Sequence, residues 1–195
     1  MAIGRPRAFD TDGALERAMQ VFWRLGYEGA SLTELTRAMG INAPSLYAAF
    51  GNKEGLFKAV LDHYAARQER CMAEVLAAPT AREAMERLLY GLIDLATDPE
   101  EPPGCLLLQG GLTCGVTAPG IPEELMRRRA RLEEALRARF VQAQDAGDLP
   151  PAADPAALAR YFAVVCNGIA VQAASGADRD DLRQIALLAL RALPT

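Results

Sequence analysis

The side chains best suited to chemistry in this 195-residue chain are four cysteines and one histidine. Cys105 follows Pro103-Gly104 and is expected to begin a helix, where the helix dipole stabilises a thiolate. Two interpretations of Cys105 stay open: a redox- or electrophile-sensing thiol, and a small residue that packs the start of the helix. Cys71 and Cys166 are expected to lie in the core.

The spacing of these residues argues against a metal centre, a disulfide and an enzyme. Cys114 lies nine residues after Cys105, ~13.5 Å along a helix and on its opposite face, so the two cannot pair without unfolding that helix. His63 has neither a second histidine nor a Cys-x-x-Cys pair beside it. A nucleophilic cysteine would need a base partner that the sequence does not place. We expect no cofactor, no metal and no enzymatic activity.

A group of four arginines is the remaining feature that could bind a ligand. They fall within one predicted helix, as Arg127, Arg128, Arg129 and Arg131. A charge run of this kind is expected to be mostly a solvated face, and anion binding is the alternative.

Composition is that of a globular protein. Apolar residues make up 51% and charged residues 24% of the chain, which excludes a disordered protein. The longest uncharged runs are broken by prolines and glycines or fall short of the ~20 apolar residues that a membrane span needs. The N-terminus lacks the apolar segment of a signal peptide. We expect a cytoplasmic protein with no membrane partner.

The charge is distributed unevenly. The formal net charge is −4, with seven basic and six acidic residues in 1–58 and fourteen and nineteen in 59–195. A polyanion such as DNA would therefore meet the first third of the chain.

The elements that must position these residues are helices. Apolar residues recur at helical spacing, and no stretch alternates as a strand does. The expected fold is all-α, with helices at 11–26, 31–39, 42–50, 53–77, 81–97, 104–115, 122–147, 154–175 and 179–193. We expect two domains, a three-helix domain at 1–52 and a helical domain at 53–195.

The segment 31–53 carries the most specific local pattern. Ser31 and Glu34 have the spacing of a capping box. Gly40 supplies a left-handed turn residue, Asn42 caps the next helix, and Pro44 suits the first turn of that helix. Two short helices joined by a glycine turn predict a helix-turn-helix, whose second helix enters a DNA major groove.

This region resembles the DNA-binding domain of the TetR family of bacterial transcriptional regulators. The resemblance lies in the run GYEGASLTELTRAMGINAPSLYAAFGNKEGLF at residues 26–57. Beyond the first 60 residues only the order of helices is similar. The resemblance implies a dimeric regulator, which we expect to be a repressor, with a C-terminal domain that binds a small effector.

Roles for individual residues follow from this resemblance. Tyr47 and Lys53 look like the phosphate-contacting residues of the family, and the helix N-terminus at Ser31 and Thr33 can also donate to phosphate. The positions that read bases in the family hold Ala43, Pro44, Ser45 and Ala48. None of these four carries the Arg, Gln or Asn side chain that makes bidentate base contacts, so DNA shape should contribute much of the specificity. Ala30 and Ala49 stand where the family often has Thr and His.

An N-terminal arm precedes the first helix. Gly4-Arg5-Pro6-Arg7 resembles the core of an AT-hook, and Arg5 and Arg7 can enter a narrow minor groove. The alternative is a frayed terminus.

The last two predicted helices are apolar nearly all round, which indicates burial on more than one side. We expect a homodimer through one stripe of each helix. The predicted interface residues are Leu158, Phe162, Val165, Ile169, Leu182, Ile185 and Ala189.

The resemblance places an effector pocket within residues 81–175. The candidates are apolar or singly polar residues on otherwise apolar helices, and each of them is also a possible core residue. They are Tyr90, Cys105, Leu106, Gln109, Thr113, Phe140 and Asn167. Gly110-Gly111 inside a predicted helix is costly unless a ligand or another helix packs closely there. We expect the effector to be small and mostly apolar.

Two alternatives remain beside the ligand-released regulator. One is a chromosome-associated DNA-binding protein whose C-terminal domain binds a protein. The other is a regulator that senses electrophiles or oxidants through Cys105.

Overall fold

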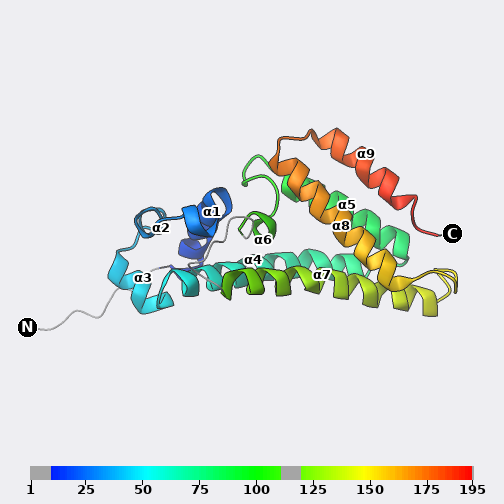
Figure 1. The fold of residues 1–195 in the computed structure, drawn as a ribbon, viewed down its shortest axis with the longest axis horizontal. Coiled ribbons are helices and arrows are strands. Elements are labelled where there is room, and N and C mark those ends of the chain that lie inside the picture. The colour runs from blue at the N-terminus through cyan, green and yellow to red at the C-terminus, as the bar shows by residue number, and fades with distance from the viewer. Residues whose placement is uncertain (1–9, 111–119, 195) are drawn as a thin grey trace, which may run out of the picture.

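The protein is described by a computed structural model, which covers residues 10–110 and 120–194. These residues form α-helices and no strand (Figure 1), so the all-α expectation is confirmed. The helices are α1 (Thr11–Gly29), α2 (Leu32–Met39), α3 (Ala43–Phe50), α4 (Lys53–Leu76), α5 (Ala81–Ala96), α6 (Leu106–Gln109), α7 (Gly120–Asp145), α8 (Pro155–Ala174) and α9 (Arg179–Leu190).

Side-chain caps and glycines set the helix ends in the first third. Asp10 caps α1 by accepting from the Gly13 amide at 3.1 Å. Gly26 has φ 69° and ψ 175°, so it breaks the helical path where the sequence predicted an end. One more turn follows this kink and brings α1 to Gly29.

Helices α1 to α3 and the first half of α4 enclose one hydrophobic core, here called the N-terminal core. Its centre is aromatic: the Phe57 ring lies 4.8 Å from that of Phe22 and 5.2 Å from that of Tyr27. Leu106 of α6 and Leu125 of α7 are buried in the same core. Elements from the second half of the chain therefore pack against the first. The boundary at residue 52 stays a prediction, and α4 contributes to both cores.

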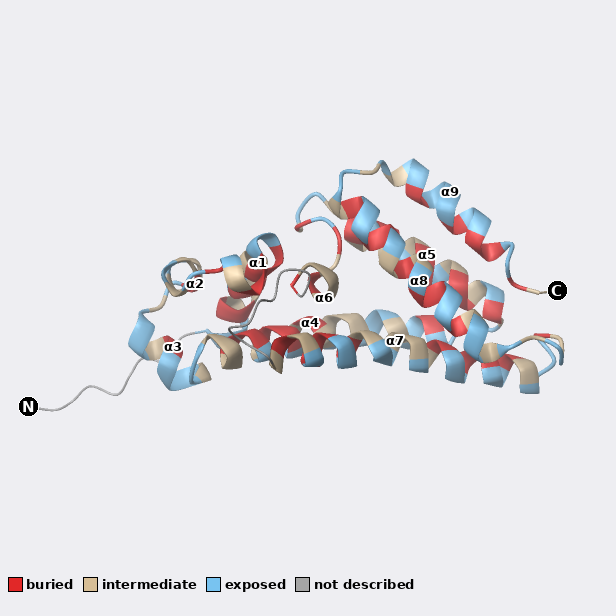
Figure 2. Ribbon diagram, viewed as in Figure 1, coloured by how far each residue is buried: buried red, intermediate tan, exposed pale blue. Residues whose placement is uncertain are grey.

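The second core, here called the C-terminal core, lies among α5, α7, α8 and α9 with the end of α4 (Figure 2). Phe140 of α7 and Phe162 of α8 meet there with ring centroids 5.8 Å apart. By length and composition alone α8 could span a membrane. It contacts α5, α7 and α9, so it is the central helix of this bundle.

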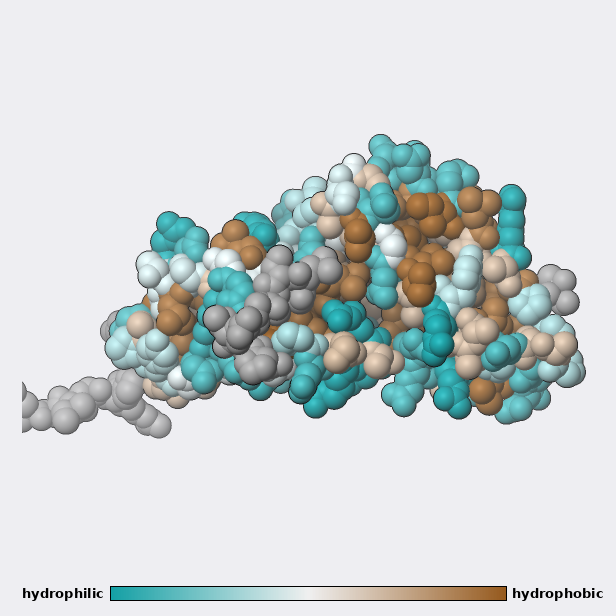
Figure 3. Space-filling view, in the orientation of Figure 1, coloured by the Kyte–Doolittle hydropathy of each residue, from teal (hydrophilic) through white to brown (hydrophobic). Residues whose placement is uncertain are grey.

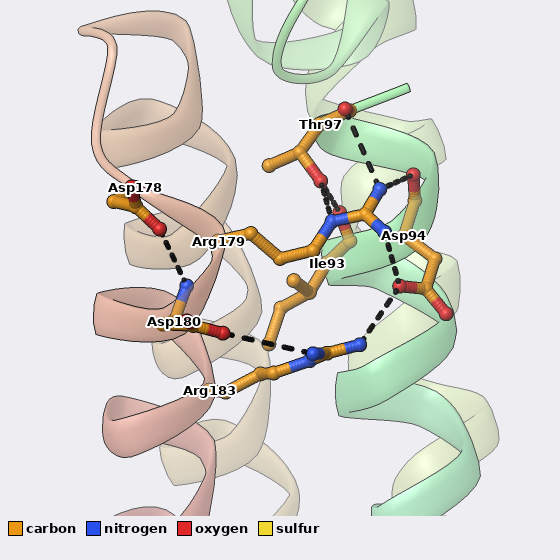
Figure 4. A network of polar contacts seen from close by, with 7 residues as sticks. All are labelled: Ile93, Asp94, Thr97, Asp178, Arg179, Asp180 and Arg183. Carbon is orange, nitrogen blue, oxygen red and sulfur yellow. Dashed lines mark hydrogen bonds and ion pairs between the residues drawn. The ribbon is translucent and has the colours of Figure 1, made fainter. Parts of the chain in front are cut away.

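Polar contacts fix the last helix against α5 (Figure 4). Arg179 donates through Nε to Thr97 Oγ1 at 2.8 Å, and its Nη1 lies 3.4 Å from Asp94 Oδ1. Arg183 reaches the same carboxylate at 3.8 Å. Asp178 caps the start of α9. These contacts orient α9 so that one of its faces completes the C-terminal core.

The structure describes residues 104–110 of the predicted helix at 104–115. Only the four residues of α6 are helical, and 111–119 lie outside the described residues. Gly104 precedes α6 with φ +92°, and a Cβ there would lie 2.9 Å from the Ala170 carbonyl oxygen. A Cβ on Gly110 would lie 3.1 Å from the Phe57 ring. The close packing expected at Gly110 is therefore present, against the N-terminal core.

Candidate functional site

The α2–α3 unit has the geometry of a helix-turn-helix. Ser31 Oγ accepts from the Glu34 amide at 3.1 Å, and the Glu34 carboxylate accepts from the Ser31 amide at 3.0 Å. The Ser31 hydroxyl also donates to Glu34 Oε2 at 2.7 Å, and this hydrogen bond, together with the one from the Ser31 amide, lowers the pKa of the Glu34 carboxyl below its ordinary value. Gly40 ends α2 with φ 70°, and Asn42 caps α3 by accepting from the Ser45 amide at 2.9 Å. The predicted caps and turn are confirmed.

One face of α3 is anchored and the other is free. Leu46 is fully buried in the N-terminal core, which fixes how α3 is rotated about its axis. Ser45 is half-buried. The exposed positions are Ala43, Pro44, Tyr47, Ala48 and Ala49. Four of the five predicted contact residues on α3 therefore lie on its exposed face.

The residues predicted to contact phosphate flank this face. Tyr47 is 47% exposed. Lys53 begins α4, where its Nζ lies 4.6 Å from the Tyr27 ring centroid and donates to the Glu28 carbonyl at 3.5 Å. This cation–π contact holds the ammonium against the end of α1. Thr33 is exposed on the first turn of α2.

The arm residues Arg5 and Arg7 lie outside the described residues. Their minor-groove role stays a prediction.

A second candidate site is a cavity of about 670 Å³ among the helices that follow the α2–α3 unit. Its wall comes from α4, α5, α6, α7 and α8, with most of the lining apolar. A volume of this size suits a small-molecule ligand. The apolar residues on its wall include Met72, Val75, Leu88, Leu92, Leu95, Leu107, Leu108 and Leu132.

The predicted pocket residues divide between this cavity and the two cores. Those that line the cavity are Tyr90, Cys105 and Asn167. Leu106 is buried in the N-terminal core and Phe140 in the C-terminal core, so neither lines this cavity. An apolar residue on an apolar helix does not reveal which neighbour it faces. Gln109 is absent from the cavity wall, and Thr113 lies outside the described residues.

Sequence reasoning missed most of the cavity wall. The α4 contribution recurs at Ala65, Gln68, Met72 and Val75, a row with helical spacing. Arg128 and Arg129 of α7 also line the cavity. The row on α4 was visible in the sequence, but its use as a wall depends on α5, α7 and α8 packing around it.

The cysteines have environments that the sequence did not define. The Tyr64 hydroxyl donates a hydrogen bond to Cys105 Sγ at 3.6 Å. The pKa of Tyr64 is raised well above its ordinary value, mainly because the side chain is buried and secondly because Cys105 lies beside it. Burial also raises the pKa of the Cys166 thiol to about 12. Cys105 precedes a helix of only four residues, which supplies little of the dipole assumed for it. Cys71 is exposed, so the expectation that it lies in the core was wrong.

One carboxylate joins the cavity region to the first helix. Glu101 accepts from Arg67 Nη1 of α4 at 2.5 Å and from Gln20 Nε2 of α1 at 2.6 Å. The hydrogen bond to Glu101 raises the pKa of the Arg67 guanidinium. The loop that carries Glu101 leads to Cys105 and α6, and α6 contacts α1 directly. Direct contacts therefore run from the cavity wall through α6 to α1, which packs against α2.

A buried ion pair links α7 to α4. Arg128 donates through Nε to Glu124 at 2.6 Å and through Nη2 to Asp62 at 2.5 Å. The side chains of Arg128 and Glu124 are each 8% exposed. Arg128 is therefore not part of a solvated face, contrary to the expectation for most of the arginine cluster.

The predicted dimer stripe faces inward. The buried members are Phe162, Ile169, Leu182 and Ala189, and all four belong to the C-terminal core. Leu158 and Val165 are half-buried, and Ile185 is exposed. These four residues are at most 2% exposed and offer almost no surface to a partner, so the dimer interface stays a prediction that the half-buried and exposed members of the stripe can carry. The sequence could not decide which side of each apolar helix is turned outward.

Comparisons with known proteins agree with this architecture. Residues 14–60 match the model of bacterial regulatory proteins of the tetR family, and residues 81–187 match the tetracyclin repressor-like C-terminal domain. The HTH-type transcriptional repressor ComR of Escherichia coli (strain K12) is 37% identical over 98% of this chain and 92% of its own length.

A solved structure extends the similarity to three dimensions. A cysteine mutant of the TetR family transcriptional regulator CifR, complexed with 26bp double-strand operator DNA, is 44% identical. It covers 97% of this chain and 100% of its own, with a TM-score of 0.94. A family model spanning more than half of the chain and a near full-length relative converge on one assignment. The chain belongs to the TetR family of bacterial transcriptional regulators, DNA-binding proteins rather than enzymes.

Proposed function

We propose that this chain is a cytoplasmic repressor that binds a near-palindromic operator as a homodimer and releases it when a small molecule occupies the cavity. The observation that carries the proposal is that α6 contacts both the cavity and the N-terminal core. Its residues Leu107 and Leu108 line the cavity, while Leu106 is buried against α1. A ligand that displaces α6 must also disturb the helix that supports the α2–α3 unit.

The DNA contact is assigned to the exposed face of α3. Ala43 and Pro44 can touch thymine methyl groups, and Tyr47 and Lys53 can contact phosphates on either side. Because this face carries no bidentate base reader, much of the sequence preference should come from DNA shape. The operator complex of the related CifR supports the same docking of the family fold.

The dimer contact is assigned to the outward faces of α8 and α9, where apolar side chains gather on the surface (Figure 3). The exposed apolar residues are Tyr161, Val164, Val171, Ile185, Leu187 and Leu188. On α8 they recur at helical spacing with Gly168, whose Cα has open space around it. Exposed apolar side chains gathered on one helix face mark an interaction surface. A two-fold axis through it would present two α3 helices to two half-sites.

The release step follows from population shift. The protein is taken to have two conformations, one that binds the operator and one in which α6 is displaced. A ligand that binds the displaced conformation more tightly shifts the population toward it. The most that the ligand can lower operator affinity is the factor by which its own affinity differs between the two conformations. The Glu101 contacts to Arg67 and Gln20 provide a second link between the cavity loop and α1.

The first experiment is a titration of the purified protein on the intergenic DNA next to its own gene, at several salt concentrations with excess nonspecific DNA. Competitor-resistant binding to one near-palindrome is expected, with Tyr47→Phe weakening it and Arg137→Gln, at an exposed position of α7, leaving it unchanged. Binding that competitor abolishes would contradict operator recognition and favour the chromosome-associated alternative.

Thiol sensing by Cys105 has a narrower basis. Cys105 lines the cavity and accepts from Tyr64, so an adduct there would fill the effector site. The test is the alkylation rate of Cys105 in a Cys71→Ser background. A rate above that of a free peptide thiol supports sensing, and a slower rate excludes it.

A further inference from the structure

The cavity wall is apolar except for a group of charged side chains. Its apolar residues come from α4 to α8, including Leu88 and Leu92 of α5 and Ala170 of α8. An apolar ligand body would be favoured over most of this surface because its burial removes hydrocarbon from water. The charged residues decide what else the ligand must carry.

Positive charge dominates that group. The cavity is lined by Arg87, Arg128, Arg129 and Arg131 but by only two carboxylates, Glu69 and Glu74. This excess runs against the surrounding chain, because residues 59–195 hold fourteen basic and nineteen acidic residues. Both glutamates are exposed on α4, so the side of the cavity formed by α7 is the cationic one.

Arg129 is the half-buried arginine of the cavity wall. Its Nη1 donates to the Leu107 carbonyl at 2.8 Å. Among the described residues no carboxylate pairs with it. The hydrogen bond to Leu107 holds the guanidinium at the cavity, and the remaining donors of its planar fork suit a carboxylate.

Arg128 offers a second unsatisfied donor. Its Nε and Nη2 bond to Glu124 and Asp62, but its Nη1 is buried with no hydrogen-bond partner among the described residues. A buried N–H without an acceptor costs free energy. An oxygen atom brought in by a ligand, with a small adjustment of the side chain, would remove that cost.

We propose that the effector is an amphipathic carboxylate, with its apolar body against α5 and α8 and its carboxylate at Arg129 and the Nη1 of Arg128. The inference rests on the proposed function, since it treats the cavity as the effector site, and it names the chemical class of the ligand. An anion at this position would also act next to Leu107 of α6, the element that reaches α1.

The test compares two probes of equal length, octanoate and 1-octanol, by isothermal titration calorimetry on the full-length protein. Octanoate is expected to bind at least about tenfold more tightly, because a hydrogen bond to a charged group outweighs one between neutral groups. Arg129→Gln should remove about tenfold of the octanoate affinity and leave 1-octanol within about twofold. Arg129→Lys, which keeps the charge but not the planar fork, should lie between the two.

Arg137→Gln is the matched control, because Arg137 is an exposed arginine of the same helix that does not line the cavity. Equal affinity for the two probes, equal effects of R129Q and R137Q, or no binding of either probe would overturn the inference. The same preparations are titrated on operator DNA. Intact operator binding without an octanoate preference rejects the ligand class alone, and an octanoate preference without operator binding rejects the proposed function alone.

Discussion

The α2–α3 unit and the cavity are built in opposite ways. The unit takes its shape from contacts between residues three or four apart, such as the reciprocal bonds of Ser31 and Glu34 and the Asn42 cap. The cavity takes its shape from residues far apart in the chain, such as Arg128 and Asp62. A DNA-reading face built locally can keep its form while the effector region moves, which is what a ligand-released regulator requires.

The largest expected effect is on the long-range side of this comparison. Arg128→Met leaves Glu124 buried with only the exposed Arg127 beside it and should lower the free energy of unfolding by about 3 kcal/mol. Chemical denaturation measures it. The exposed Arg137→Met should change little.

The double variant Arg128→Met/Glu124→Leu should recover much of the loss, because an apolar pair no longer leaves a charge unpaired. Equal losses in the single and double variants would mean that packing, not charge pairing, holds α7 in place.

The next effect concerns the turn at Gly104, which leads into α6. Gly104→Ala adds a Cβ at positive φ and 2.9 Å from the Ala170 carbonyl, so a loss of about 1–3 kcal/mol in unfolding free energy is expected. Gly147→Ala is the control, since Gly147 also has positive φ but nothing within 4 Å. The difference between the two variants in denaturation isolates the close approach to α8. Equal losses would show that the backbone conformation alone matters.

A smaller effect is expected on the coupling free energy between ligand binding in the cavity and operator binding by the α2–α3 unit. Glu101→Gln weakens the contacts to Arg67 and Gln20 while keeping the shape of the side chain. We expect octanoate affinity to remain, while the ratio of octanoate affinities without and with operator falls by about threefold to tenfold, about 1 kcal/mol of coupling. The neighbouring exposed Glu100→Gln should leave that ratio unchanged. An unchanged ratio in both variants would mean that α6 alone carries the signal.

The same contrast explains what sequence could predict. Capping boxes, a left-handed glycine and helix periodicity are local, so the bounds of α2 and α3 and the exposed residues of α3 were predicted closely. The α8 and α9 helices are apolar on several sides, and only their packing shows that Phe162 and Leu182 face inward while Val164 and Leu188 face out. The helix expected at 104–115 is four residues long in the described part and begins after Gly104, whose positive φ and close approach to α8 are not compatible with a helix start at that residue.

The smallest expected effect tests whether hydrogen bonds between neighbouring residues stabilise the α2–α3 unit. Hydrogen bonds from Ser31 lower the pKa of Glu34 in the folded protein, so between the folded and unfolded pKa values the folded state binds fewer protons. The stability that the carboxylate contributes is therefore present above its unfolded pKa of about 4.3 and is lost as pH falls through the folded value. Wild type and Glu34→Gln should differ in unfolding free energy at pH 7 and converge once the pH falls below the folded pKa of Glu34, measured by urea denaturation. A difference that stays constant with pH would show that Glu34 acts through shape rather than charge. That result would weaken the view that local hydrogen bonds hold the DNA-reading helix independently of the cavity.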